Sequence, residues 1–410
     1  MPPPRSPLAP ERFPEVPAVA GVRRGACAAG LRYRGRPDLA LFDLAEGTTV
    51  AGLLTRSAVP GHPVAWCRRI LPRGRARGLV VNAGNANVLG GEAGDAAVRA
   101  EAETAAALLG AAREDVFIAS TGVIGEPLPV AKITAALPDL HAALAPSAWR
   151  EAAEAICTTD TFAKGAFARA AIGDAEVSVA GVAKGSGMIQ PDMATMLAFL
   201  FTDAVLPAAT LQPLLEVACA RSFHAITVDS DTSTSDTLLL FATGRARHPV
   251  PHGPHDPLLD DFRRGLEHVA RDLALQVVRD GEGAAKLIAI SVHGAIDDAS
   301  ARRIGLAVAN SPLVKTAIAG EDANWGRIAM AIGKAGEPVE LAKLAIAFGG
   351  HAVARDGARV PDLDEAPVVA HLKGKEIAIA VTVGGGPGSA TVWTCDLTHG
   401  YIAINADYRS

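Results

Sequence analysis

Strand-like and helix-like segments alternate along almost the whole chain, and this alternation restricts the fold more than any other feature. Short apolar runs such as "RGLVVNAGNAN" and "DTLLLFATG" have the length of buried strands. Between them lie stretches with helical period, such as "AGDAAVRAEAETAAALLGA" and "LLDDFRRGLEHVARDLALQVVRD". The opening segment from Val19 to Ile70 has only short, broken apolar runs, which indicates a strand-rich opening. The sequence therefore predicts an α/β or α+β layered architecture, in which helices cover sheets.

Length and local breaks indicate more than one domain. A chain of 410 residues is longer than a single hydrophobic core usually organises. Prolines crowd residues 1–16, which we expect to form a disordered leader. The turn "DGEG" ends the long helical stretch, and a new series of strands and helices follows it. We therefore expect a larger domain at residues 17–280 and a smaller C-terminal domain at residues 281–410.

Composition excludes several classes of function. The net charge is -5 and the basic residues are dispersed, which argues against binding to nucleic acid or to an anionic membrane. No apolar run reaches the roughly 18 residues that a membrane-spanning helix needs. The five cysteines are far apart and form no CxxC pair, a pattern typical of buried reduced thiols in a cytoplasmic protein.

Three common kinds of site are not supported by the motifs. Neither "GVAKGSG" nor "GGGPGSA" matches a nucleotide-binding glycine loop. His248, His252 and His255 share a proline-rich loop without cysteine, which favours an incidental cluster over a metal site. Ser186 lies between two glycines, but the GxSxG pattern of serine hydrolases is absent. Nothing in these motifs calls for a metal ion or an organic cofactor.

Thr195 occupies an unusual position in "GVAKGSGMIQPDMATMLAFLF". It stands where a glycine-rich loop meets an apolar, strand-like run. A threonine hydroxyl is a poor nucleophile unless a base lies beside it, and a threonine at a new chain end carries such a base in its own α-amine. That amine has a pKa near ~7.7 to 8.0 and can accept the hydroxyl proton. Spacing alone, however, favours the simpler interpretation that Thr195 begins a buried strand.

A wider resemblance reverses that preference. The chain resembles the ornithine acetyltransferases of the cyclic arginine pathway, also called bifunctional glutamate N-acetyltransferases, over nearly its whole length. The blocks that carry the resemblance are "NAGNAN", "STGVIGEPLP", "CTTDT", "AKGSGMIQPDMATMLAFLFTDA", "SFHAITVDSDTSTSDT", "VRDGEGAAKLI", "NSPLVKTAIAGEDANWGRI" and "WTCDLTHGYIAINADYRS". Their number and order make a chance match very improbable.

The resemblance implies a self-processing enzyme of the N-terminal-nucleophile type. Members of the family cut themselves at an Ala-Thr bond, which here is the bond between Ala194 and Thr195. We then expect an α chain of residues 1–194 and a β chain of residues 195–410 that begins with the nucleophile. The family moves an acetyl group from N-acetylornithine to glutamate through an acetyl-threonine ester. It assembles as an α2β2 heterotetramer, and acetyl-CoA as a further substrate stays an open alternative.

The resemblance also implies the other site residues. The oxyanion donors are Thr121 and Gly122. Without the resemblance, Gly122 would be interpreted as a turn residue after a strand. Lys184 suits the α-carboxylate that ornithine and glutamate share, and Glu282 suits an amino group. The remaining substrate-binding residues are Thr158 or Thr159, with the choice left open, the nucleophile Thr195 itself, Asn405 and Ser410.

Some positions depart from the family pattern, and two other functions stay in competition. Ser230 and Ser235 stand where the family usually has Gly and Asn, Ala285 replaces a common Thr, and Ser410 is often a threonine. We expect these departures to affect the choice of substrate more than the acetyl transfer itself.

One competing function is a related self-cleaving aminopeptidase or amidase, which passes its acyl group to water. The other is an uncleaved binding protein that retains the fold.

Overall fold

The chain divides into two compact units that each contain helices and strands. The structure is a computed structural model and describes residues 4–190 and 196–407. Of these, the larger unit contains residues 10–190, 196–224 and 231–277, and the smaller unit contains residues 4–9, 225–230 and 278–407. Both units mix helices with sheets, which confirms the α/β class predicted from the alternating segments.

Two sheets form the centre of the larger unit. Their strand orders are β1-β2-β4-β5 and β3-β9-β8-β7-β6. The strands are β1 (Val22–Cys27), β2 (Leu39–Leu44), β3 (Thr49–Leu54), β4 (Gly78–Asn85), β5 (Val116–Val123), β6 (Lys164–Ile172), β7 (Ala175–Lys184), β8 (Leu197–Thr202) and β9 (Thr237–Ala242). β4 runs parallel to β5, and β8 runs parallel to β9. The carboxyl ends of β4 and β5 therefore lie side by side, and Thr121 and Gly122 are found there.

An aromatic core joins the two sheets of the larger unit. Phe42 of β2 stacks on Phe201 of β8 with ring centroids 5.1 Å apart. Phe201 in turn stacks on Phe241 of β9 at 5.4 Å. All three side chains are completely buried. Because burial of one such ring contributes about 1.5 to 3 kcal/mol, this stack holds the two sheets face to face.

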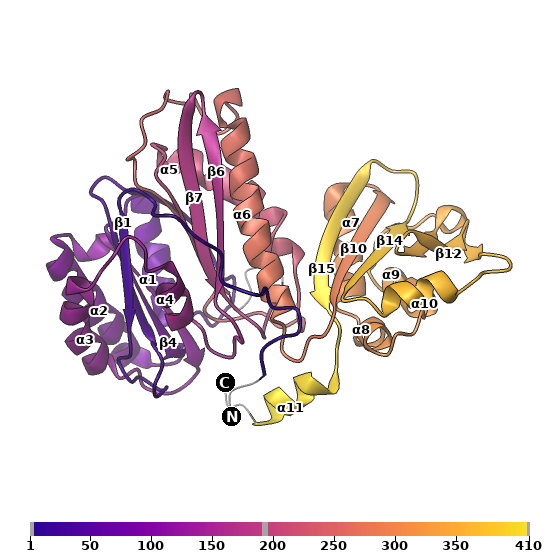
Figure 1. Cartoon of the computed structure of the whole chain (residues 1–410), viewed down its shortest axis with the longest axis horizontal. Helices are drawn as coiled ribbons and strands as arrows, with labels where there is room; N and C mark the ends of the chain where they lie inside the picture. Colours follow the sequence, from indigo (N-terminus) through magenta and orange to yellow (C-terminus); the bar gives the residue numbers. More distant parts are fainter. Residues whose placement is uncertain (1–3, 191–195, 408–410) are drawn as a thin grey trace. The chain divides into compact units, whose positions relative to one another are not determined.

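Helices cover the outer faces of these sheets (Figure 1). α2 and α3 pack on the four-stranded sheet, whereas α5 and α6 pack on the five-stranded sheet. α1 lies along the outer side of β5, where the Trp66 indole donates to the Val116 carbonyl and the Cys67 thiol to the Ile118 carbonyl. The helices are α1 (His62–Ile70), α2 (Gly91–Leu109), α3 (Val130–Ala142), α4 (Trp149–Ala155), α5 (Ala208–Ala220) and α6 (Asp260–Arg279).

The opening segment contains one helix that the sequence did not predict. The opening up to Ile70 was expected to be rich in strands, and it contains β1, β2 and β3 together with α1, which begins at His62. Pro63 is tolerated there because the first turn of a helix needs no partner for its backbone nitrogen. Val64, Cys67 and Ile70 are buried at a spacing of three, which places them on one face. The sequence pattern did not reveal α1, because nine residues give too few periods to distinguish a helix from broken strands.

The smaller unit is built on one six-stranded sheet. Its order is β13-β12-β11-β14-β10-β15. The elements are β10 (Leu287–Ala295), α7 (Asp298–Ala309), α8 (Pro312–Ala319), α9 (Trp325–Gly333), β11 (Ala345–Phe348), β12 (His351–Arg355), β13 (Ala358–Arg359), α10 (Ala366–Leu372), β14 (Glu376–Thr382), β15 (Gly388–Cys395) and α11 (His399–Asp407). β14, "EIAIAVT", alternates exposed and buried residues, and α7 packs on β10 and β15. The sheet thus buries one face under helices, as antiparallel-rich sheets commonly do.

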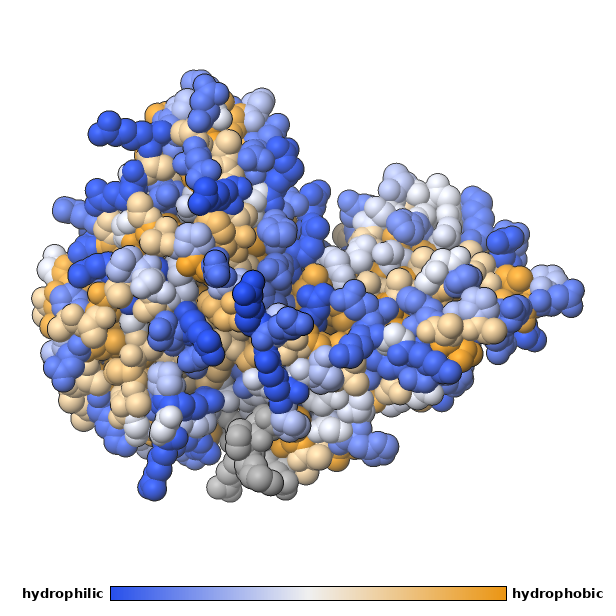
Figure 2. All heavy atoms as spheres, viewed as in Figure 1, coloured by the Kyte–Doolittle hydropathy of each residue, from blue (hydrophilic) through white to orange (hydrophobic). Residues whose placement is uncertain are grey.

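Some large apolar side chains of the described residues are exposed, among them Leu89, Val250, Leu341 and Ile402. Figure 2 shows one face, on which hydrophilic and hydrophobic residues lie interspersed. Within residues 4–190 and 196–407, no helix combines the length and the apolarity that a membrane crossing requires. None of the five cysteines forms a disulfide; four are buried, as expected, and Cys27 is half-buried.

Glu101 of α2 makes the stability of the larger unit dependent on pH. Its side chain is completely buried, and neither carboxyl oxygen has a hydrogen-bond partner among the described residues. Burial raises the pKa of Glu101 from 4.5 to about 8, because the charged form loses its hydration. The folded chain therefore keeps a proton that the unfolded chain releases above 4.5, so stability falls as pH rises from 4.5 to about 8.

The Glu101→Gln variant, which is neutral at every pH, is expected to unfold at a higher temperature than the wild type at alkaline pH. Its advantage should be near zero at about pH 4.5 and grow by up to about 1.4 kcal/mol per pH unit towards about pH 8. Thermal unfolding at three pH values measures this difference. Glu103→Gln, an exposed change on the same helix, is the matched control. An advantage of Glu101→Gln that is equal at all pH values would contradict the buried-acid explanation.

Candidate active site

The site residues predicted from the sequence fall into two groups. Those in the larger unit are Thr121, Gly122, Thr158, Thr159 and Lys184, and those in the smaller unit are Glu282 and Asn405. Ala194, Thr195 and Ser410 lie outside the described residues.

Lys184 and Thr121 contact each other inside the larger unit. Lys184 is the last residue of β7, and Thr121 lies near the end of β5. Both side chains are buried, and the Lys184 Nζ donates a hydrogen bond of 3.2 Å to the Thr121 Oγ1. Because an ammonium group can only donate, the Thr121 hydroxyl is the acceptor here. Its own hydrogen is therefore left to point towards another acceptor, such as a developing negative oxygen.

Gly122 lies where β4 and β5 approach each other closely. Its φ is +132°, and the adjacent Gly84 in β4 has a φ of +107°. A Cβ atom on Gly122 would lie 2.3 Å from the carbonyl carbon of Gly84 and 2.5 Å from the nitrogen of Asn85. Only glycine fits such a position. The close approach of the two strands and the positive φ therefore require glycine at position 122. Gly122 is a strand residue and not the turn residue suggested by the sequence alone.

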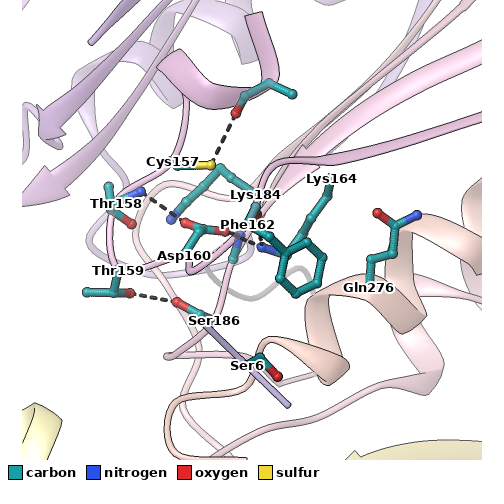
Figure 3. Close-up of polar contacts among 12 residues, drawn as sticks. Ser6, Cys157, Thr158, Thr159, Asp160, Phe162, Lys164, Lys184, Ser186 and Gln276 are labelled. Carbon is teal, nitrogen blue, oxygen red and sulfur yellow. Dashed lines mark hydrogen bonds and ion pairs between the residues drawn. The ribbon is translucent and has the colours of Figure 1, made fainter. Parts of the chain in front are cut away.

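The loop that carries Thr158 and Thr159 follows α4. The backbone nitrogen of Thr158 donates to Asp160 Oδ2 at 2.9 Å. The Thr159 hydroxyl shares a hydrogen bond of 2.6 Å with the hydroxyl of Ser186, which lies in the loop after β7. Figure 3 shows both contacts. Thr159 therefore ties the two loops together, while Thr158 is held through its backbone.

Asp160 and Lys164 form a buried ion pair that sequence reasoning missed. The Lys164 Nζ lies 2.6 Å from Asp160 Oδ1, and both side chains are fully buried. The same oxygen accepts a hydrogen bond of 2.7 Å from the backbone nitrogen of Gly185. Burial alone would raise the pKa of Asp160, but the charges of Lys164 and Lys184 outweigh it and hold this pKa below its usual range. The polar cluster "CTTDT" was the only signal in the sequence, and it did not reveal the partner.

Asp236 is a second buried carboxyl that sequence reasoning missed. Its Oδ1 accepts a hydrogen bond of 2.9 Å from the nitrogen of Met196, the first described residue after the predicted nucleophile. Its Oδ2 is buried and has no hydrogen-bond partner within residues 4–190 and 196–407. Burial raises the pKa of Asp236 well above its usual value, and this effect is opposed by the Met196 nitrogen and by the charge of Lys184. The start of β8 is therefore anchored to a buried carboxyl group through the Met196 nitrogen.

In the smaller unit, Glu282 and Asn405 contact each other directly. The Asn405 Nδ2 donates to Glu282 Oε2 at 2.7 Å and to the Tyr401 carbonyl at 3.1 Å. α11, which carries Asn405, packs tightly on the turn after α6, because a Cβ atom on Gly283 would lie 2.4 Å from the nitrogen of Tyr401. Two residues that are far apart in the sequence thus form one polar pair.

The described part of the chain shows no preformed metal centre. Within residues 4–190 and 196–407, no group of three or more His, Cys, Asp or Glu side chains is arranged to hold a metal ion. The ring of His248, one of the three loop histidines, is engaged by the backbone: its Nε2 accepts from the Val205 nitrogen at 2.8 Å, and its Nδ1 lies 2.7 Å from the Pro249 carbonyl.

Comparison with known proteins gives matches over nearly the full length. The model of the ArgJ family matches residues 23–410. The arginine biosynthesis bifunctional protein ArgJ of Gluconobacter oxydans is 56% identical over 407 residues, which cover 99% of this chain and 96% of that protein. A crystal structure of the arginine biosynthesis bifunctional protein argJ from Bacillus halodurans is 38% identical, covers 51% of this chain and 98% of its own, and has a TM-score of 0.49. The ornithine acetyltransferase of Mycobacterium tuberculosis, solved in complex with ornithine, is 32% identical, covers 44% of this chain and 94% of its own, and has a TM-score of 0.38.

Proposed function

This chain belongs to the ArgJ family, and from that premise we propose that it transfers an acetyl group from N2-acetyl-L-ornithine to L-glutamate. The products are L-ornithine and N-acetyl-L-glutamate. The family makes the chain an acyltransferase of arginine biosynthesis. The observation that carries the proposal is the full-length match, with 56% identity over 99% of the chain to a bifunctional protein of that pathway.

Thr195 is the proposed nucleophile. Its hydroxyl oxygen bonds to the acetyl carbon of N-acetylornithine, and the amide bond to ornithine breaks. The hydroxyl proton passes through the α-amine of Thr195 to the departing amine. The amine of glutamate then attacks the acetyl ester, its proton returns to the threonine oxygen, and N-acetylglutamate leaves. No metal ion or organic cofactor enters either step.

Thr121 and Gly122 are the proposed oxyanion donors. Each acyl transfer places a negative charge on the carbonyl oxygen, and fixed donors in a buried site stabilise that charge. The hydrogen bond from Lys184 to Thr121 supports this role, because it uses the acceptor side of the hydroxyl and leaves its hydrogen for the oxyanion.

Substrate recognition is assigned by charge. Ornithine and glutamate both carry an α-carboxylate, for which the Lys184 cation is the proposed partner. Glu282 and its partner Asn405 suit an amino group, since they combine an acceptor carboxylate with an amide. Thr158 or Thr159, the nucleophile Thr195 and the terminal Ser410 complete the proposed set.

Self-cleavage is proposed to expose the α-amine of Thr195. The threonine hydroxyl attacks the carbonyl of Ala194, the peptide bond becomes an ester, and water hydrolyses the ester. The α chain of residues 1–194 keeps Lys184, and the β chain begins with the nucleophile. We propose that two copies of each chain assemble as an α2β2 heterotetramer in the cytoplasm.

Product analysis tests this function. When the purified protein is incubated with N-acetylornithine labelled in its acetyl group and with glutamate, the label is expected to appear in N-acetylglutamate. Free acetate as the sole labelled product would instead identify a self-cleaving hydrolase. In a parallel reaction acetyl-CoA replaces N-acetylornithine. Formation of N-acetylglutamate there would show that the enzyme also performs the first acetylation.

A further inference from the structure

One buried carboxylate joins two loops of the larger unit. Asp160 Oδ1 accepts from the Gly185 nitrogen at 2.7 Å, and Asp160 Oδ2 accepts from the Thr158 nitrogen at 2.9 Å. The Gly185 nitrogen belongs to the peptide bond that follows Lys184, and this planar unit is attached directly to the Lys184 Cα. Asp160 therefore restrains the backbones of Lys184 and Thr158 at the same time.

The sheet register explains why Asp160 reaches this position. Lys164 starts β6 and pairs with Ala183, the neighbour of Lys184 in β7. Asp160 precedes Lys164 by four residues, and the contact of 2.6 Å between their side chains folds the loop back over the end of the sheet. The bond between Thr159 and Ser186 links the same two loops a second time. Figure 3 shows the group, with Asp160 between Thr158 and Lys164.

The ion pair is a poor device for stability alone. Two charges buried without access to water lose their hydration, and their attraction often only offsets that loss. An apolar pair of similar volume commonly holds a fold equally well. A residue whose only role was to fill this space would have no need to be charged. The carboxylate does, however, supply two directed acceptors, which an apolar side chain cannot.

We propose that Asp160, with Lys164 as its counter-ion, is a positioning residue for acetyl transfer that sets the placement of Lys184 and of the Thr158 loop. This inference rests on the proposed function of the same site. Asp160 acts through the backbone and does not itself need to touch the substrate. Because Lys184 is assigned to the carboxylate that both substrates share, a displaced Lys184 weakens the binding of both.

The test separates positioning from stability with a double variant. Asp160→Asn and Lys164→Met, made singly, are each expected to lower the thermal midpoint, because each leaves a buried partner uncompensated. The double variant Asp160→Asn/Lys164→Met removes both charges and is expected to recover most of that loss. Its asparagine keeps one acceptor for the Gly185 nitrogen but has none for the Thr158 nitrogen.

The recovered stability is not expected to restore substrate binding. In the double variant we expect the KM values for N-acetylornithine and for glutamate both to rise about tenfold or more, with a smaller change in kcat. The Kd for L-ornithine, measured by titration calorimetry without turnover, should rise by a similar factor. Wild-type KM and Kd values in the stable double variant would show that the pair is merely structural and would overturn the inference.

A matched control and an independent readout keep the two proposals distinct. Glu101→Gln also removes a buried carboxyl from the larger unit, and it is expected to leave both KM values unchanged. A wild-type protein that binds ornithine but transfers no acetyl group would contradict the proposed function and not the positioning role. Wild-type transfer combined with unchanged binding in the double variant would contradict the positioning role alone.

Discussion

The Thr195→Ala variant is expected to remain one intact chain of 42.0 kDa and to transfer no acetyl group. Alanine removes the oxygen that is proposed to attack the Ala194 carbonyl during cleavage and the acetyl carbonyl during transfer. Loss of a covalent nucleophile lowers kcat by at least about a thousandfold, and here the same change also prevents the α-amine from forming. Denaturing electrophoresis shows whether the chain has been cleaved. The formation of ornithine and N-acetylglutamate from N-acetylornithine and glutamate measures the transfer.

Thr195→Ser is the matched control, because serine keeps the hydroxyl and loses only a methyl group. It is expected to cleave and to transfer at measurable rates. Complete cleavage of the alanine variant would show that another residue is responsible for cleavage. Transfer by an uncleaved alanine variant would disprove the nucleophile assignment, since neither the hydroxyl nor the free amine would then be needed.

Local patterns predicted the strands and helices well where the periods were long. "AEVSVAGVAK" forms β7, and the stretch around "FRRGLEHVARDLALQVV" forms α6, as expected from their length and spacing. The helix α1 was not predicted because its buried face is defined by contact with β5. That surface is created by a strand about fifty residues later in the chain. No local window contains it.

The candidate site was predicted from family motifs, and its internal contacts were not. Asp160 and Asp236 look like ordinary polar residues in the sequence, because burial and partners arise only after the chain has folded. The pair of Glu282 and Asn405 joins residues from two distant blocks, and no spacing rule connects them. Hydrogen bonds such as that from Gly185 to Asp160 depend on the register of β6 with β7, which the strand pattern alone does not fix.

The second large effect is expected from Thr121→Val, which has nearly the same volume but no hydroxyl. If Thr121 donates to the oxyanion, kcat for acetyl transfer should fall about a hundredfold to a thousandfold, while KM changes little. This is the opposite signature to that expected for the Asp160→Asn/Lys164→Met variant, in which KM rises and kcat is less affected. The two variants therefore distinguish a group that stabilises the transition state from one that places a binding cation.

Thr121→Ser tests whether the hydroxyl itself is responsible, because it restores the donor without the methyl group and should recover most of kcat. The hydrogen bond from Lys184 provides the critical comparison. Valine also removes an acceptor from that buried cation, so any displacement of Lys184 adds to its effect. That displacement would raise KM for both N-acetylornithine and glutamate. A rise in KM without a fall in kcat would therefore contradict the oxyanion role of Thr121. It would indicate that Thr121 supports Lys184 instead.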